Sequence, residues 1–356
     1  MPTKIKKNID SISEKVKYQH RKDEHLSLAQ KYWHDGRLSG NGLENIRLIP
    51  NTLPEISMSE VDISSQLFDH HFEKPFYIEA MTGGTPRGDK INAQLAEIAK
   101  NQHIAMAVGS QSIALKYPEL EAGFTKVREI HKNGFLFANI GANIGVEEAK
   151  RAVDMIDADA LEIHVNVIQE IGMPDGDKDF YWLDNINEIA SLIDLPVIVK
   201  EVGFGMSQRT FKLLEETAVS GINVGGSGGT NFAWIEKHRT NPFSLFLDEQ
   251  GLSLAESLIE AEYSHSSKKL IATGGIQYAD QIVKSQILGA SLVSSAGDIL
   301  FNLVENGADY VELILDGWSS DLKRFYTLLG AKKWSDLRNS ELIYSGQLLD
   351  FINQRK

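Results

Sequence analysis

The segment LEIHVNVIQE, residues 161–170, places ionisable side chains on an otherwise apolar pattern. Its apolar residues alternate with Glu162, His164 and Asn166, and a period of two predicts a strand whose two faces differ. One face therefore carries a carboxyl, an imidazole and an amide, although parallel strands covered by helices are usually continuous apolar runs. We expect these polar groups to face a functional site.

Gln169 and Glu170 follow this strand directly and extend the polar set. One carboxylate is a poor metal site by itself, but Mg²⁺ takes one or two carboxylates and completes its shell with substrate phosphates and water. Together with His164 and Asn166, these residues predict a site for Mg²⁺ and for a substrate with an anionic end. Two structural alternatives stay open, in which His164 is an internally bonded histidine and Gln169 is a solvated loop residue.

Cations occur at two further places of interest. Lys200 closes the apolar run PVIVKEV, residues 196–202. Because burying an unpaired ammonium is costly, we expect Lys200 to be functional, either as a Schiff base or as a positive charge against a cofactor. A basic cluster, HRKDEHLSLA, occupies residues 20–29. This cluster is either a solvated helix face or a lid over a phosphate.

A scaffold of alternating strands and helices must position these residues. Helix-like segments such as 89–102, 146–157 and 278–290 separate eight short apolar or β-branched runs. The alternation predicts the α/β class and a (β/α)8 TIM barrel, with a doubly wound open sheet as the alternative. The eight runs are residues 76–81, 104–109, 135–141, 160–165, 196–202, 221–226, 269–275 and 291–297.

Every run ends in small, amide, hydroxyl or charged residues. In such a barrel the C-terminal ends of the strands meet at one rim, where active sites lie. The last two runs end in TGGIQ (273–277) and SSAG (294–297), and loops at these places commonly bind phosphate through backbone N–H groups. A tight turn is the plainer explanation for any single glycine cluster. No G-x-G-x-x-G turn between a strand and a helix and no G-x-x-x-x-G-K-[ST] loop is present, so Rossmann and P-loop sites lack support.

The chain contains no Pro/Ser-rich linker and no low-complexity segment, so we expect one domain over residues 1–356. Residues 1–70 are expected to form an N-terminal extension or lid over one end of the barrel. Residues 71–300 would form the barrel core. Residues 301–356 carry a helical pattern and a tail, which predicts a C-terminal helical segment.

The formal net charge is −13, and the chain has no cysteine. The acidic balance argues against nucleic-acid binding, which relies on basic patches. The missing cysteines exclude disulfides, thiolate metal sites and a cysteine nucleophile. The sequence contains no run of 18 consecutive apolar residues, so it predicts no membrane-spanning helix. The N-terminal segment lacks the apolar core of a secretory signal. We therefore expect a cytoplasmic protein that does not associate with a membrane and acts on a small molecule.

The motifs RKDEHLSLA, AMTGG, GSQ, NIGAN, HVNVIQE, KEVGFG, GGSGGTNF and TGGIQ occur in this order from about residue 21 to about residue 300. In this combination the chain resembles the type 2 isopentenyl-diphosphate isomerases, and H-x-N-x-x-Q-E joined with RK-x-EH is the specific part. The resemblance implies a barrel that binds FMN and Mg²⁺ and interconverts isopentenyl and dimethylallyl diphosphate in isoprenoid biosynthesis. The resemblance also implies that activity requires the reduced flavin, although the reaction has no net redox change. NADPH as the reductant and a homo-tetramer or homo-octamer are further implications.

The resemblance also implies a role for each site residue. Glu170 would ligate Mg²⁺, Lys200 would lie beside the flavin ring, and Gln169 and His164 would be catalytic. The substrate would be bound by Arg21, Lys22, His25, His164, Asn166 and Gln169. The flavin ring and ribityl chain would contact Ala80, Met81, Thr82, Ser110 and Asn139, and the FMN phosphate would contact Thr230, Gly274, Gly275, Ala296 and Gly297.

One position departs from the family pattern. Gln277 stands where an arginine is common, so we expect weaker FMN binding or a compensating cation elsewhere. Moving a double bond requires adding a proton at one carbon and removing one at another, and Gln169 is a poor acid. We therefore expect reduced flavin to be the acid–base catalyst, with Gln169 positioning or relaying the proton. Glu162 receives no role from the sequence.

Two other functions compete with this assignment. An FMN-dependent barrel oxidoreductase acting on a small anionic substrate would need, by family resemblance, a His–Gly–Gly motif or a catalytic cysteine. TGGIQ supplies no histidine, and the chain has no cysteine. A non-enzymatic flavin-binding protein would not need Glu170 as a metal ligand.

Overall fold

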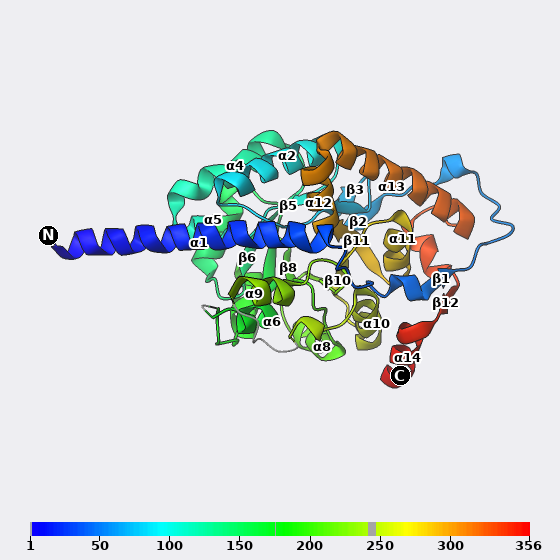
Figure 1. The fold of residues 1–356 in the computed structure, drawn as a ribbon. Helices are drawn as coiled ribbons and strands as arrows, with labels where there is room; N and C mark the ends of the chain where they lie inside the picture. The colour runs from blue at the N-terminus through cyan, green and yellow to red at the C-terminus, as the bar shows by residue number, and fades with distance from the viewer. Residues whose placement is uncertain (1, 175, 241–246) are drawn as a thin grey trace.

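A computed structural model describes residues 2–174, 176–240 and 247–356, with residues 2–13 and 240 described by their backbone only. Eight parallel strands close into a barrel in the order β10-β11-β4-β5-β6-β7-β8-β9 (Figure 1). The predicted (β/α)8 class is therefore confirmed. The barrel strands are β4 (Phe76–Ile78), β5 (Met106–Ala107), β6 (Leu136–Gly141), β7 (Ala160–Val165), β8 (Val197–Glu201), β9 (Gly221–Asn223), β10 (Lys269–Thr273) and β11 (Ala290–Ser295).

Helices surround the barrel and cover the apolar outer sides of its strands (Figure 1). The helix after β4 begins at Thr85, whose hydroxyl accepts a hydrogen bond from the N–H of Gly88 at 3.0 Å, the usual arrangement of a threonine N-cap. The surrounding helices are α2 (Pro86–Gln102), α3 (Ser112–Lys116), α4 (Glu121–Ile130), α5 (Val146–Met155), α6 (Val167–Gly172), α7 (Leu183–Leu192), α8 (Gln208–Glu215), α9 (Phe232–Thr240), α10 (Leu254–Ser264), α11 (Ala279–Ile287) and α12 (Gly297–Asn306).

Several strands end earlier than the sequence pattern predicts. β4 ends at Ile78 instead of residue 81, and β9 ends at Asn223 instead of residue 226. After β9 the chain leaves the ladder at Gly225, whose φ of 49° is a conformation that glycine adopts without steric cost. The polar residues that end these two runs therefore belong to loops at the rim.

The barrel interior changes from apolar to polar along the direction of the strands. Toward the N-terminal ends, Tyr77 stacks on Phe137 with ring centroids 4.9 Å apart, within a buried cluster that includes Ile198 and Leu292. Two residues further along these strands the inward side chains are polar, as the layered filling of such barrels permits. This polar layer consists of Glu79, Asn139, Glu162, Lys200, Asn223, Thr273 and Ser294.

The segment before β4 reaches both ends of the barrel. Helix α1 (Pro2–His34) lies across the C-terminal ends of the strands, and its first turns extend beyond the barrel (Figure 1). At the opposite end, the hairpin of β2 (Ser65–Leu67) and β3 (His70–Phe72) packs its apolar side chains into the lower interior cluster. The expectation that this segment covers one end is therefore incomplete, and the expected boundary at residue 70 falls inside β3.

The last part of the chain contains the predicted helices, α13 (Ala308–Leu329) and α14 (Gly346–Arg355). It also contains a strand in the part for which the sequence predicts only a tail. This strand, β12 (Leu342–Tyr344), pairs antiparallel with β1 (Ile46–Leu48). Among the described residues, no helix is long and apolar enough to cross a lipid bilayer.

Candidate active site

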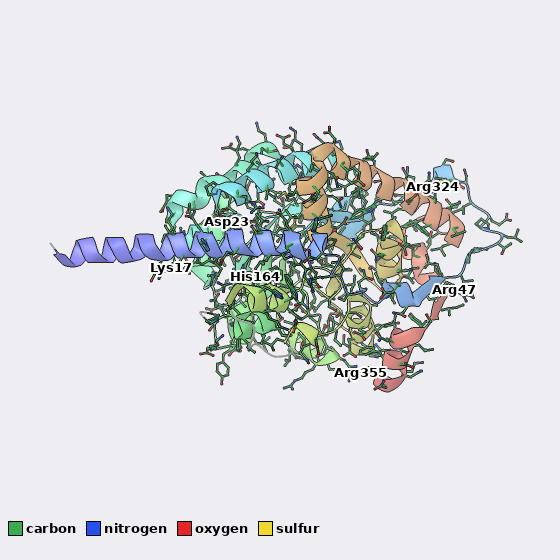
Figure 2. The ribbon with its side chains drawn as sticks, viewed as in Figure 1. Lys17, Asp23, Arg47, His164, Arg324 and Arg355 are labelled. Carbon is green, nitrogen blue, oxygen red and sulfur yellow. The ribbon has the colours of Figure 1, made fainter. Side chains whose placement is uncertain are left out.

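A cavity of about 290 Å³ lies between α1 and the C-terminal ends of the barrel strands. Figure 2 labels His164 close to α1 in that view, with Asp23 on the helix itself. Every residue predicted for substrate, flavin or metal binding lines this cavity. They are Arg21, Lys22, His25, Ala80, Met81, Thr82, Ser110, Asn139, His164, Asn166, Gln169, Glu170, Lys200, Thr230, Gly274, Gly275, Ala296 and Gly297.

Polar side chains of α1 form hydrogen bonds with the loops at the C-terminal ends of the barrel strands. The ammonium of Lys22 donates to the carbonyl oxygens of Gly83 at 2.7 Å and Ser110 at 3.0 Å. Asp23 accepts a hydrogen bond from the hydroxyl of Thr85, the N-cap of α2, at 2.8 Å. Burial lowers the pKa of Lys22 to about 7. Lys22, which was predicted to bind the substrate, thus lies in the cavity wall, and it donates hydrogen bonds to two backbone carbonyls.

Gln169 is held at both ends of its amide. Asn166 Nδ2 donates to Gln169 Oε1 at 3.2 Å, and Gln169 Nε2 donates to Glu236 Oε1 at 3.5 Å. Glu236 lies on α9 with a fully buried side chain, and His25 Nε2 lies 2.6 Å from its Oε1. Burial raises the pKa of Glu236, but the bonds and charges of His25 and Arg239 outweigh burial and hold it below its usual value. Gln169 therefore contacts a buried carboxylate.

Glu170 is oriented by two donors. Asn166 Nδ2 donates to Glu170 Oε1 at 2.8 Å, and the backbone N–H of Asp177 donates to Glu170 Oε2 at 2.6 Å. Within the part of the chain that the structure describes, no group of three or more histidine and acidic side chains is arranged to hold a metal. A single oriented carboxylate fits a Mg²⁺ whose other ligands are substrate phosphate and water.

His164 is a neutral imidazole in this structure. Burial lowers its pKa to about 3, and the nearby charges of Lys200 and Lys22 act in the same direction. Its Nδ1 lies 2.9 Å from Oδ1 of Asn139. An amide oxygen only accepts hydrogen bonds, so this contact is a hydrogen bond when Nδ1 carries the hydrogen.

Lys200 is buried in an ion pair at the base of the cavity. Its ammonium lies 3.5 Å from Oε1 of Glu79, and the two side chains are 7% and 1% exposed. Burial lowers the pKa of Lys200, but Glu79 and the nearby carboxyl groups of Glu162 and Glu201 together outweigh burial and raise it. A Schiff base needs a neutral amine, so the structure favours the second hypothesis, a fixed positive charge.

The loops after β9, β10 and β11 form a cradle lined by glycine. A Cβ atom at Gly274 or Gly275, both at positive φ, would meet the carbonyl oxygens of Gly226 and Gly228. Helix α12 begins beside this cradle, so its first N–H groups and its dipole favour an anion there. These features fit the phosphate of FMN. Gln277, the position that departs from the family pattern, donates to Asp298 Oδ1 at 3.3 Å.

Four residues near the cavity escaped the sequence analysis. Glu79 is the charged residue of the run FYIEAM, residues 76–81, and its side chain points into the barrel. The reasoning that singled out Glu162, a carboxyl group on an apolar strand, would also have singled out Glu79. Glu201 accepts hydrogen bonds from the N–H groups of the loop that follows it. Trp33 and Glu236 lie on helices, where no strand-end pattern marks them; Trp33 Nε1 donates to Thr230 Oγ1 at 2.8 Å.

The fold defines the class of the protein as a (β/α)8 barrel with a glycine-lined cradle at the C-terminal ends of its strands, and a family match adds dependence on FMN. A family described as FMN-dependent dehydrogenase matches residues 149–344. Among solved structures, a flavocytochrome b2 mutant with benzoylformate has a TM-score of 0.65 at 16% identity, over 90% of this chain and 80% of that one. A mandelate oxidase with 2-hydroxy-phenylacetamide has a TM-score of 0.61 at 15% identity, over 91% of each chain. At these identities the likeness concerns the fold.

Within that class, the chain belongs to the isopentenyl-diphosphate delta-isomerase family. A protein of that name from Lactococcus lactis is 61% identical over 347 residues, 97% of this chain and 99% of the relative. Relatives of the same name from Latilactobacillus sakei and Listeria monocytogenes are 43% and 40% identical, over 94% and 97% of this chain and 96% and 95% of their own lengths. The resemblance inferred from the motifs is thereby confirmed.

Proposed function

We propose that the chain interconverts isopentenyl diphosphate and dimethylallyl diphosphate, using reduced FMN and Mg²⁺. One observation carries this proposal: cations on α1, a glycine-lined anion cradle, an oriented carboxylate and an untitratable amide line the same cavity. The names of the relatives support the choice of substrate. NADPH as the reductant and assembly into tetramers or octamers rest on the family resemblance alone.

The flavin would be held at two places. Gly274, Gly275 and the first turn of α12 would take its phosphate through backbone N–H groups. Lys200, kept charged by Glu79, would place a fixed cation against the ring and favour its anionic reduced form. When bound, reduced FMN supplies a group that gives and takes a proton beside an electron-rich surface.

The diphosphate would lie toward α1. Arg21 supplies positive charge there, and Lys22, whose pKa burial lowers to about 7, would gain its proton as the anion binds. Long-range attraction by the rest of this acidic chain is not available. Glu170 would carry the Mg²⁺, with its two oxygens already oriented by Asn166 and the N–H of Asp177. The metal would then be completed by diphosphate oxygens and water.

Gln169 would hold the reacting carbons in place. Its amide oxygen is occupied by Asn166 and its amide nitrogen faces Glu236, so its plane is fixed before substrate arrives. Fixed geometry of this kind lowers the barrier because little reorganisation is needed at the moment of reaction. Glu236 in turn is held by His25, which joins this network to α1.

The decisive experiment is an anaerobic incubation of the full chain with isopentenyl diphosphate, FMN, Mg²⁺ and a reductant, followed by product analysis. We expect dimethylallyl diphosphate only when all components are present. E170Q should lose Mg²⁺-dependent activity and retain flavin. E147Q, a change at a side chain that is 83% exposed on α5, is the matched control and should behave as wild type. Absence of dimethylallyl diphosphate in the complete mixture would refute the proposal.

The same preparation separates the competing functions. Reduction of bound FMN by a 2-hydroxy acid such as mandelate, without isomerisation, would assign the chain to the oxidoreductases. Flavin binding without either reaction would assign it to flavin-binding proteins. We expect neither, because Thr273 precedes Gly274 and Gly275 where the hydroxy-acid oxidases would need a histidine.

A further inference from the structure

Glu162 lies in the middle of β7 with no exposed surface. Its neighbour in the β6 ladder is Asn139, and its side chain belongs to the polar layer inside the barrel. Two residues further along the same strand, on the same face, lies His164. A carboxyl group at this depth is costly unless it is neutral or fully bonded, so its contacts indicate what it does.

A chain of hydrogen bonds joins Glu162 to His164. Asn139 Nδ2 donates to Glu162 Oε2 at 3.0 Å. The other end of the same amide, Oδ1, accepts from His164 Nδ1 at 2.9 Å. Because Glu162 Oε2 takes the NH₂ of Asn139, the amide must present its oxygen to the imidazole. The acceptor on Glu162 therefore sets which nitrogen of His164 carries the hydrogen.

The opposite oxygen of Glu162 meets a hydroxyl that is shared. Tyr77 Oη lies 3.0 Å from Glu79 Oε2 and 3.2 Å from Glu162 Oε1. The tyrosine has one hydrogen and can donate it to one carboxyl group only. A hydrogen on Glu162 Oε1, donated back to the Tyr77 oxygen, satisfies the second contact.

Glu79 is the member of this pair that stays ionised. It accepts hydrogen bonds from the N–H of Ala80 at 2.7 Å and the hydroxyl of Ser294 at 2.7 Å. It also forms the ion pair with Lys200. With Glu79 charged, a neutral Glu162 leaves the pair of carboxyls and the lysine without net charge, whereas an ionised Glu162 would add an uncompensated charge in the interior.

The surroundings of Glu162 act in the same direction. Burial raises its pKa, and the adjacent charge of Glu79 raises it further, while Lys200 opposes both. The polar and charged groups that act directly on Glu162 are Tyr77 and Glu79 from β4 and its end, Asn139 from β6 and Lys200 from β8. Glu201 from β8 acts on Lys200, Asn223 from β9 is bonded to Glu79, and His164 from β7 is bonded to Asn139.

We propose that Glu162 is an un-ionised carboxylic acid that acts as a positioning residue, fixing His164 through Asn139 in the tautomer with hydrogen on Nδ1. Nε2 then carries no hydrogen, so His164 meets an anionic oxygen, itself an acceptor, only through a bridging donor such as water. The backbone carbonyl of Ile140 also lies against the imidazole. The anionic oxygen is that of the diphosphate substrate only if the proposed function is correct. The tautomer and the protonation of Glu162 do not depend on the reaction.

The test uses the flavin-loaded full chain with ¹⁵N-labelled histidine, and the His164 nitrogens are identified by comparison with H164Q. We expect the Nδ1–H tautomer from pH 6 to pH 8 in the wild type and in E162Q, since an amide accepts from Asn139 and donates to Tyr77. In E162A the acceptor is lost, and we expect a mixture of tautomers. E260Q, which changes a buried carboxyl on α10 bonded to Arg355, is the control and should retain the wild-type spectrum.

Infrared spectroscopy covers the case in which E162A does not fold. The wild type should show a carbonyl band of a protonated carboxyl group that disappears in the near-isosteric E162Q. An unchanged infrared spectrum in E162Q, or an Nε2–H tautomer in the wild type, would overturn the proposal. If the chain is an isomerase, kcat should be nearly unchanged in E162Q and fall about ten- to a hundredfold in E162A, as for lost supports of a site residue. If the chain does not isomerise the substrate, the ¹⁵N and infrared spectra still test the proposal, because neither depends on the reaction.

Discussion

The ammonium of Lys22 lies 2.7 Å from the carbonyl oxygen of Gly83. This bond joins α1 to the loop after β4, and it is made by a side chain whose pKa burial lowers to about 7. The same side chain lines the cavity. The helix that covers the cavity is therefore attached to the rim through an amine whose protonation state we expect an anionic ligand to change.

The first prediction concerns proton uptake by Lys22. At pH 8 the free protein holds this amine mostly neutral, and a diphosphate anion beside it favours the ammonium. Binding of Mg²⁺–pyrophosphate should take up about one more proton in the wild type than in K22M. Titration calorimetry in two buffers of different ionisation enthalpy measures this difference. K15M changes a partly exposed lysine of α1 whose ammonium donates to Glu119, and it should match wild type. Equal uptake in K22M would contradict the prediction.

The second prediction concerns the buried ion pair of Lys200 and Glu79. E79Q removes the carboxylate that forms the ion pair with Lys200 in the barrel, which should lower the free energy of unfolding by about 3–5 kcal/mol. Urea unfolding measures the loss. The double variant E79Q/K200M should recover part of it, because both charges are then removed. E73Q, at an exposed position before β4, should change the free energy of unfolding by less than about 0.5 kcal/mol.

The third prediction concerns Glu236 and Gln169. E236Q removes the charge that holds His25 and meets the Gln169 amide, so Gln169 loses its fixed plane. We expect kcat for isomerisation to fall about a hundredfold, with a smaller change in KM. E249Q, an exposed change in the segment after α9, is the control. A change in KM alone would show that Glu236 serves substrate binding.

The fourth prediction concerns pH and stability. The pKa of His164 is about 3 in the folded protein, whereas an unfolded histidine titrates near about 6.5. Between these values the unfolded chain binds a proton that the folded protein does not, so stability falls as pH falls. From pH 7 to pH 5, wild type should lose about 2 kcal/mol more than H164Q. Unfolding in urea with saturating FMN measures this. H34Q, at a side chain 73% exposed, should retain the wild-type pH dependence.

The fifth prediction concerns the flavin cradle. Gln277 donates to Asp298, which lies at the start of α12 and whose pKa burial raises to about 6. Q277R would replace an amide with a cation beside the cradle, and we expect FMN to bind about fivefold more tightly, equivalent to ~1 kcal/mol. Fluorescence titration of the flavin-free chain measures the dissociation constant. D309N, in the first turn of α13, should have no effect; weaker binding in Q277R would place the phosphate elsewhere.

Local patterns predicted the barrel because each of its strands is a short apolar run followed by a helix, and closure follows from eight such units. The same patterns missed β1 and β12, because each is three residues long and its partner lies almost 300 residues away. The β2–β3 hairpin was missed for a related reason. His70 and His71 interrupt its apolar pattern, and its apolar side chains become meaningful only against the barrel floor.

The candidate site was predictable where strands end, because the barrel brings those ends together. Gln169, Glu170 and the glycine loops are examples. Partners on helices were not predictable, and Glu236 lies among polar residues of α9 like those of any exposed helix face. The pairing of Glu79 with Lys200 needed the cross-barrel geometry. Which carboxyl group holds a proton depends on such contacts across the barrel, so the order of residues in the sequence does not predict it.

The pairing of β1 with β12 has a consequence for how the protein is made. Residues 46–48 leave the ribosome early, and their partners at 342–344 leave it almost 300 residues later. The barrel strands can therefore associate on the nascent chain before β1, which follows α1, has a strand to pair with. We expect this pair of strands to form only after all eight barrel strands have been synthesised, so the barrel must assemble without it.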